Sequence, residues 1–174
     1  GYIVYDGNQQ GKRPAVLVVH EWWGMNDYAR SRARQLAEMG YIAMAVDLYG
    51  NDRRADNPTD AGNLAGPFYA NPAMAKARFD AALTKLKEYK EVDTENMAGI
   101  GYCFGGGMLL NLARMGEPLK GIVSFHGSLL GTPADTPEQA MKQIDQDIAF
   151  IKEIKQINPK TEIIIYVYSP VPTE

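Results

Sequence analysis

The sequence predicts an α/β protein with a mostly parallel sheet and helices on both faces of that sheet. Short apolar runs rich in β-branched residues alternate along the chain with amphipathic stretches of helical spacing. The apolar runs are nearly continuous, which is typical of parallel strands that are buried on both faces. A chain of 174 residues, 45% of them hydrophobic, is long enough to bury one sizeable core and too short for two full domains.

The first part of the chain predicts a strand, a helix and a second strand. Residues 15–20, "AVLVVH", form a short apolar run that indicates a buried strand. Residues 26–40 predict a helix, which begins at an Asn-Asp pair that can cap it and ends at Gly40. Residues 41–47, "YIAMAVD", predict a second buried strand.

The middle of the chain predicts a loop followed by a long helix. Residues 51–72 are polar and rich in Pro, Asp, Asn and Gly, so we expect mostly loop there. Residues 72–90 predict a helix, because their apolar residues recur at helical spacing on one face. These residues are Ala75, Phe79, Ala82, Leu83 and Leu86.

Two further strands and a helix complete the predicted core. Residues 97–101 and 121–126 predict strands, and residues 106–116 predict a helix that Gly116 closes. We expect the strand at 97–101 to lie between those at 15–20 and 121–126. Ligands bind beyond the carboxyl ends of the strands in such sheets, and polar or aromatic residues gather at three of these ends. They are His20-Glu21-Trp22-Trp23, Cys103 and His126.

Composition excludes several classes of function. The net charge is −3 and no basic run extends beyond the pair Arg53-Arg54, so we expect no nucleic-acid partner. No apolar run approaches the ~20 residues that span a bilayer, so we expect no membrane partner. One cysteine excludes an internal disulfide, and two histidines make a metal site unexpected, so neither a metal nor another cofactor is predicted.

The run "GIGYCFGGGM" at residues 99–108 contains the only cysteine, and three interpretations compete for it. A dinucleotide fingerprint fails at its third glycine, where Phe104 stands, and a P-loop fails because no Lys-Ser/Thr pair follows. The third interpretation is the G-x-nucleophile-x-G elbow, with Cys103 as the nucleophile. A following helix would lower the pKa of the thiol and offer N–H groups to an oxyanion. The alternative is a purely structural role, in which a glycine-rich turn surrounds a buried, inert cysteine.

The chain resembles the dienelactone hydrolase family, whose members are cysteine hydrolases of α/β-hydrolase fold. The resemblance covers residues 13–129 through "RPAVLVVHEWWGMND", "GYIAMAVDLYG", "VDTENMAGIGYCFGG" and "GIVSFHGSL", in order and with matching spacing. It implies an α/β-hydrolase-like three-layer sandwich, with a core over residues 1–130. It also implies a small-molecule ester or lactone as substrate.

The resemblance implies roles for individual residues. Cys103 matches the family's nucleophile, and Glu21 matches a glutamate that helps to generate the thiolate. The backbone N–H groups of Trp22 and Phe104 match the oxyanion hole. These roles agree with the chemistry, because a thiolate needs a proton partner and an acyl oxyanion needs two fixed donors.

Four further residues are weaker candidates for substrate binding: Trp23, Arg53, Arg54 and His126. Each has a plain alternative as a pocket wall, a structural residue or a solvated surface residue. The two arginines fall in the loop where the family places a cation for the carboxylate of its substrate.

The tail at residues 131–174 departs from the resemblance. The family continues with an aspartate and a histidine, but no histidine follows His126 in this chain. The tail instead predicts a helix with Ile144, Ile148, Ile151 and Ile154 at helical spacing, then a strand within "EIIIYVY" that can add to the sheet edge. We therefore expect an incomplete site and a helix–strand tail, either packed on the same domain or of divergent origin.

The leading hypothesis is an ester or lactone hydrolase that uses a cysteine nucleophile and is impaired by the missing Asp and His. The runner-up is a catalytically inactive α/β-hydrolase-like domain or fragment that binds a ligand or partner. A dinucleotide-binding oxidoreductase is a third and weaker class. The expected compartment is the cytoplasm, although the start at Gly1 rather than Met leaves a removed signal peptide open. The sequence does not indicate the oligomeric state.

Overall fold

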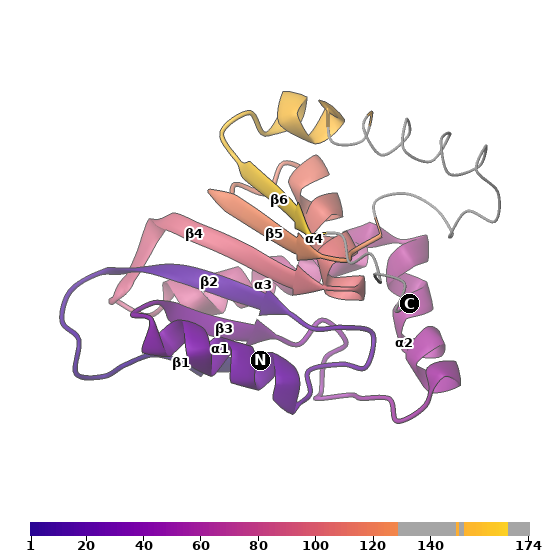
Figure 1. Cartoon of the computed structure of the whole chain (residues 1–174), viewed down its shortest axis with the longest axis horizontal. Helices are drawn as coiled ribbons and strands as arrows, with labels where there is room; N and C mark the ends of the chain where they lie inside the picture. Colours follow the sequence, from indigo (N-terminus) through magenta and orange to yellow (C-terminus); the bar gives the residue numbers. More distant parts are fainter. Residues whose placement is uncertain (129–148, 150–151, 167–174) are drawn as a thin grey trace, which may run out of the picture.

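The computed structural model describes residues 1–128, 149 and 152–166, and this part of the chain forms a six-stranded sheet (Figure 1). The strand order is β1–β3–β2–β4–β5–β6, and every neighbouring pair is parallel except β1 and β3. The strands are β1 (Tyr2–Val4), β2 (Arg13–Val19), β3 (Ile42–Val46), β4 (Val92–Tyr102), β5 (Gly121–Phe125) and β6 (Glu162–Tyr166). The predicted mostly parallel sheet is therefore confirmed.

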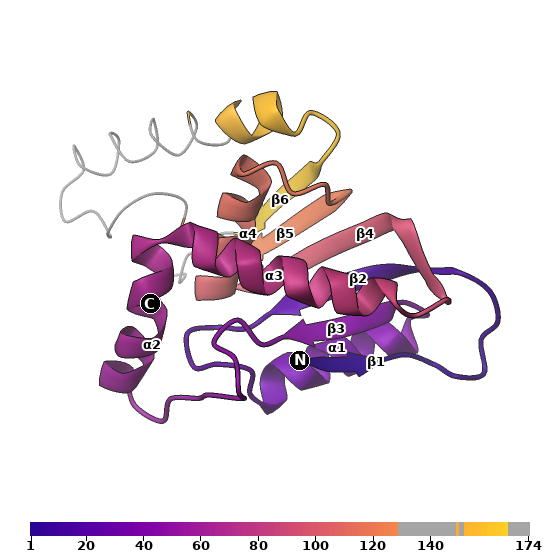
Figure 2. The same cartoon turned by 180° about the vertical axis from the view of Figure 1, so that it is seen from behind.

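Helices cover both faces of the sheet, as Figures 1 and 2 show from opposite sides. The helix α1 (Asp27–Glu38) packs on one face, and α3 (Pro72–Lys87) and α4 (Phe104–Arg114) pack on the other. Alternate side chains of β3 pack on opposite faces of the sheet, because successive side chains of a strand point to opposite sides. Ala43 and Ala45 belong to the cluster under α1, and Met44 belongs to the larger cluster under α3 and α4.

The four inner strands that the sequence predicts are all present. The strands β2 and β5 flank β4, which is the predicted order. The predicted helices over 26–40, 72–90 and 106–116 correspond to α1, α3 and α4, although α4 begins earlier than predicted, at Phe104. The short strand β1, which pairs Tyr2 with Ala45 in antiparallel register, was not predicted.

The prediction of a loop over residues 51–72 is wrong, because α2 (Pro58–Ala70) occupies most of that stretch. The Asn57 side chain caps the helix by accepting a hydrogen bond from the Asp60 N–H at 3.0 Å, and Pro58 takes the first helical position. Burial of an apolar face that includes Phe68 outweighs the helix-breaking residues inside α2. In both views α2 lies beyond the carboxyl ends of the strands.

The described part of the tail adds to the same sheet. The strand predicted within "EIIIYVY" is β6, and it pairs in parallel with β5 at the edge of the sheet. Residues 152–157 are helical, and Ile154 is fully buried in the core. The other three isoleucines of the predicted tail helix, at 144, 148 and 151, lie outside the described residues. The division between residues 130 and 131 also lies outside them and stays a prediction.

Candidate active site

The carboxyl ends of three adjacent strands bring the main candidate residues to one edge of the sheet. His20 follows β2, Cys103 follows β4, and His126 follows β5. The Cys103 N–H donates a hydrogen bond to the Phe125 carbonyl at 2.9 Å, so the turn after β4 is fixed to the end of β5. The sequence predicted this convergence from strand order and strand ends alone.

Cys103 occupies a sharp turn between β4 and α4. Its backbone has φ 50° and ψ −115°, which is unusual for a residue with a Cβ, and its side chain is half-buried. Glycines on either side of Cys103 allow the neighbouring backbones to approach closely at this turn. A Cβ on Gly101 would lie 2.5 Å from the Gly105 backbone, and a Cβ on Gly105 would lie 2.5 Å from the His20 carbonyl oxygen. The missing side chains of these glycines therefore allow the strand and the helix to cross in close contact.

The surroundings of the Cys103 thiol raise its pKa. Burial is the largest cause, and the negative charge of Glu21 raises the pKa further. The Phe104 N–H, at the start of α4, acts in the opposite direction through a hydrogen bond to the sulfur. The expected effect of the helix N-terminus is therefore present, but burial outweighs it and the resting group favours the thiol.

Glu21, Trp22 and Trp23 form the loop that faces this turn. All three side chains are half-buried, and the two indole rings meet edge to face with centroids 5.3 Å apart. The charge of Glu21 acts on both Cys103 and Tyr102, so the carboxylate lies within electrostatic reach of the thiol. Its role as the proton partner of Cys103 stays a prediction.

An aromatic cluster lies beside the turn, and sequence reasoning missed most of it. The Phe104 ring lies 5.5 Å from the rings of Tyr49 and Tyr69 and 5.9 Å from that of Phe68, between centroids. Tyr69 is half exposed, and its pKa is raised by burial and by the charge of Cys103. The signal that could have found Phe68 and Tyr69 is the Asn57-Pro58 helix start, which places α2 here.

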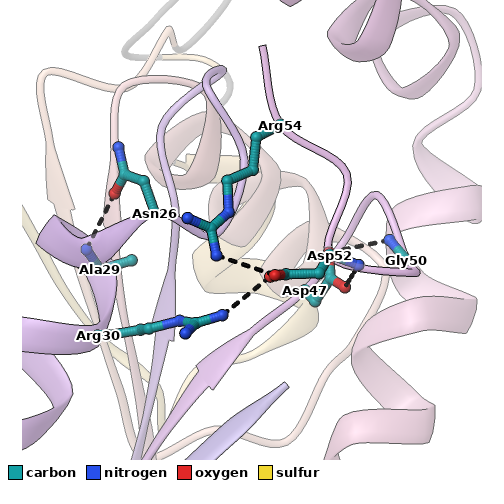
Figure 3. Close-up of polar contacts among 7 residues, drawn as sticks. All are labelled: Asn26, Ala29, Arg30, Asp47, Gly50, Asp52 and Arg54. Atoms are coloured by element: carbon teal, nitrogen blue, oxygen red, sulfur yellow. Dashed lines mark hydrogen bonds and ion pairs between the residues drawn. The ribbon is translucent and has the colours of Figure 1, made fainter. Parts of the chain in front are cut away.

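Arg53 and Arg54 make contacts within the protein, of which Figure 3 shows those of Arg54. The Arg54 guanidinium pairs with Asp52 at 2.9 Å, and Arg30 of α1 pairs with the same carboxylate at 3.0 Å. The Arg53 Nε donates to the Tyr49 carbonyl oxygen at 3.1 Å. The two arginines thus stabilise the loop after β3, and their predicted contact with a substrate stays a prediction.

The carboxylate of Asp47 holds the same loop in shape. It accepts hydrogen bonds from the N–H groups of Gly50 and Asp52, each at 2.9 Å (Figure 3). Asn51 and Asp52 have φ of 57° and 54°, so the loop turns through left-handed conformations that these contacts stabilise. The loop in turn meets the Glu21–Gly24 segment, where Gly24 forms a bridge with Arg54.

The two histidines lie in different environments. His126 is exposed and has φ 41° at the end of β5, close to the turn that carries Cys103. His20 is 1% exposed, and burial lowers its pKa. Within residues 1–128, 149 and 152–166, no group of three or more His, Cys, Asp or Glu is arranged to hold a metal ion. None of the helices in these ranges is both long and apolar enough to cross a membrane.

Two solved structures of similar fold indicate the class of protein. A structure named m3DLH is 33% identical, with a TM-score of 0.78 over 97% of this chain and 75% of that chain. A dienelactone hydrolase-like promiscuous phosphotriesterase, P91, from metagenomic libraries is 30% identical, with a TM-score of 0.77 over 96% of this chain and 75% of that chain. The chain therefore has the α/β-hydrolase fold.

The chain belongs to the dienelactone hydrolase family. The model of that family matches residues 1–158, which extends past the resemblance over residues 13–129. A protein of Aquifex aeolicus named "Putative carboxymethylenebutenolidase" is 32% identical over 119 residues, which are 66% of this chain and 51% of that protein. The chain spans about half the length of the curated relatives it matches.

Proposed function

We propose that this chain is a hydrolase of the dienelactone hydrolase type that cleaves an ester or lactone with Cys103 as nucleophile. The observation that carries the proposal is the turn after β4, where Cys103 takes φ 50° directly before the first residue of α4. A strained strand-to-helix turn of this kind exposes the nucleophile above the sheet in α/β-hydrolases. Family membership and the names of the relatives support the same class of reaction.

The first half of the reaction transfers the acyl group to sulfur. The Cys103 sulfur attacks the ester carbonyl carbon, and the carbonyl electrons move onto oxygen. The backbone N–H groups of Phe104 and Trp22 donate hydrogen bonds to that oxyanion. When the tetrahedral intermediate collapses, the bond to the alcohol oxygen breaks and a thioester remains on Cys103.

Glu21 is the proposed proton partner in this step. The raised pKa of Cys103 keeps the resting group as a thiol, so attack requires a group that accepts its proton. The Glu21 carboxylate takes this proton and then gives it to the departing alkoxide. One proton shared between a thiol and a carboxylate also avoids placing two negative charges together.

The second half of the reaction, hydrolysis of the thioester, is the proposed weak step. A water molecule must lose a proton as it attacks the thioester carbon, and a histidine commonly accepts it. Histidine occurs in this chain only at 20 and 126, and His20 is buried. We expect acylation to be faster than deacylation, with His126 as the one exposed imidazole that could act as base.

The proposed substrate is a small ester or lactone, for which Trp23, Arg53, Arg54 and His126 are the proposed contacts. The names of the relatives, putative carboxymethylenebutenolidase, and of a structural neighbour, phosphotriesterase, refer to different bonds, so they do not select one substrate. A p-nitrophenyl ester is a suitable probe, because its good leaving group makes acylation easy to follow.

A catalytically inactive domain that binds a ligand is the second candidate function. The absence of histidine after His126 favours it, since loss of a triad base typically costs several orders of magnitude in rate. Release of nitrophenolate by the wild type and by Cys103→Ala separates the two candidates. The hydrolase proposal expects release above background from the wild type alone, whereas equal release from both proteins would favour the inactive domain.

A further inference from the structure

We propose that His20 is a positioning residue for the oxyanion hole. Its imidazole holds the Glu21–Trp22 peptide group so that the Trp22 N–H faces the reacting carbonyl. The inference rests on the proposed hydrolase function, and it assigns a task to a buried histidine that the reaction above does not use. The inference concerns the Trp22 N–H, which lies in a loop and needs a partner to hold it. The other proposed donor, the Phe104 N–H, belongs to α4 and is held by the helix.

Burial and ring contacts fix the imidazole of His20. The residue follows β2 directly and is 1% exposed. The Tyr49 ring meets it at 61° with centroids 4.8 Å apart, and the Phe104 ring stacks on it at 19° with centroids 5.9 Å apart. Rings on two sides leave the imidazole little freedom to rotate, so its nitrogens have fixed directions.

The hydrogen bond of His20 defines its tautomer. Its Nδ1 lies 2.5 Å from the Glu21 carbonyl oxygen, and a carbonyl oxygen only accepts, so Nδ1 carries the hydrogen. Burial favours the neutral ring, which leaves Nε2 unprotonated. Among the described residues Nε2 is buried without a hydrogen-bond partner. Because it is buried, it does not contact a water molecule whose proton it could accept. The geometry therefore suits an orienting role and not that of a general base.

The group that His20 binds is the peptide group that carries the proposed donor. The Glu21 carbonyl and the Trp22 N–H belong to one planar unit, so a bond that orients the oxygen also orients the N–H. The Gly24 N–H donates to the same oxygen at 3.2 Å. A carbonyl that accepts hydrogen bonds polarises its peptide group, which strengthens the N–H as a donor.

The next peptide group is fixed as well. The Tyr49 hydroxyl donates to the Trp22 carbonyl oxygen at 2.9 Å, so buried side chains hold the peptide groups on both sides of Trp22. Donors that are already in place when charge develops need no reorganisation during the reaction, and this is the main source of their effect. Loss of the His20 bond should therefore slow the step that forms an oxyanion.

Three variants separate the hydrogen bond from the bulk of the ring. His20→Asn keeps an N–H donor at the δ position, His20→Gln moves the donor to the ε position, and His20→Leu removes it. Two reactions of Cys103 separate the oxyanion hole from thiol reactivity. Acylation by p-nitrophenyl acetate passes through an oxyanion, whereas alkylation by iodoacetamide does not. The test measures both rate constants for the wild type and the three variants, with thermal unfolding as the check on folding.

We expect His20→Leu to lower the acylation rate by about 10–100-fold, somewhat less than the ~10²–10³-fold effect of losing an oxyanion donor outright. Alkylation should stay within about twofold, because that reaction does not use the donor. His20→Asn should recover most of the acylation rate, and His20→Gln should recover less. If His20→Leu does not fold, the comparison of Asn with Gln decides the matter.

Equal losses of acylation and alkylation would overturn the inference, since they indicate general disruption of the site. Unchanged acylation in His20→Leu, or equal recovery by Asn and Gln, would overturn it too. Failure of the proposed function has a different signature. In that case the wild type itself gives no acyl adduct on Cys103 although iodoacetamide still labels the thiol, and the inference falls with the function.

Discussion

At the scale of single residues, the proposed chemistry depends on whether the Cys103 thiol is protonated. Burial and the charge of Glu21 both raise its pKa, while the Phe104 N–H lowers it. These surroundings favour the protonated thiol, and in the proposed reaction the sulfur attacks only when its proton is removed. This arrangement predicts that the reactivity of Cys103 depends on pH and on the charge at position 21.

Replacement of Glu21 by Gln should make the thiol more acidic. The variant removes a negative charge that raises the pKa of Cys103, so the thiolate forms at lower pH. The rate of alkylation by iodoacetamide, measured from pH 6 to 10, should rise with pH in both proteins, with a lower midpoint in Glu21→Gln. Glu95→Gln, at an exposed residue near the start of β4, is the matched control and should leave the profile unchanged. Identical profiles for Glu21→Gln and the wild type would contradict the proposed pairing.

Replacement of Tyr49 by Phe should weaken acylation without removing the ring. The variant keeps the contacts with His20 and Phe104 but loses the hydrogen bond to the Trp22 carbonyl. We expect a loss of about 1 kcal/mol in the free energy of unfolding. Acylation by p-nitrophenyl acetate should slow by about 3–10-fold, which is less than the loss of a whole donor. Tyr89→Phe, which precedes β4 at the opposite end of the sheet, serves as the control for both measurements.

The sequence predicted part of this site because part of it is local. Cys103 and Glu21 each lie within two residues of the end of a predicted strand, so strand order places both at one edge of the sheet. The hydrogen bond by which Tyr49 holds the Trp22 carbonyl could not be predicted, because the two residues lie 27 positions apart in the chain. Such contacts depend on how a loop returns to the site, which periodicity does not describe.

At the scale of secondary-structure elements, β2, β4 and α4 cross in close backbone contact beside the candidate site. Glycines at positions 101 and 105 let the backbones approach closely, since a Cβ at either would lie 2.5 Å from a backbone atom. At position 105 the atoms in the way are the carbonyl oxygens of Val19 and His20, which belong to the backbone and cannot move aside easily. This crossing fixes the distance between the Cys103 turn and the Glu21–Trp22 loop.

Gly105→Ala should therefore destabilise the protein. The added methyl group overlaps two backbone oxygens, and overpacking of this kind costs about 1–3 kcal/mol in the free energy of unfolding. Gly62→Ala in α2 is the matched control, because a Cβ there meets nothing within 4 Å. In a helix the control should be neutral or stabilising by up to about 1 kcal/mol. Urea unfolding curves measure both, and equal stability of the two variants would contradict the account of the crossing.

The elements differ in how well sequence could predict them. The strands β2, β3, β4 and β5 were predicted because parallel strands buried on both faces are nearly continuous apolar runs. The helix α2 was missed because Gly62, Gly66 and Pro67 lower its intrinsic propensity, while tertiary burial of Ala61, Ala65 and Phe68 decides its fold. The strand β1 has three residues, too few for a periodic signal.

At the scale of the whole molecule, residues 158–166 of the tail are fixed to the sheet by specific polar contacts. The Thr161 hydroxyl donates to the Leu119 carbonyl at 2.6 Å in a buried position. The Asn158 amide donates to the carbonyls of Ala113 and Glu117 at 2.9 and 3.0 Å. These bonds join the segment before β6 to the end of α4 and the start of β5. We therefore expect the described part of the tail to unfold together with the core.

Thr161→Val tests whether the tail belongs to the same cooperative unit. The variant keeps the shape of the side chain but leaves the Leu119 carbonyl without its donor, which costs about 1–3 kcal/mol when the group is buried. Thr84→Val, at an exposed position of α3, is the control and should change stability by less than about 0.5 kcal/mol. Circular dichroism and tryptophan fluorescence should report one shared transition in Thr161→Val, at lower urea than in the wild type. Two separate transitions would show that the tail unfolds by itself.

The central claim is that Cys103 becomes acylated and that the thioester is hydrolysed slowly. The most direct measurement mixes the protein with excess p-nitrophenyl acetate and follows nitrophenolate release, together with the intact mass of the protein. The account predicts a burst of about one equivalent, a mass increase of one acetyl group on Cys103 and slow release afterwards. Absence of the burst and of the adduct, with the same slow release in Cys103→Ala, would contradict Cys103 as the nucleophile. Sustained rapid turnover without an accumulated adduct would contradict the slow second step.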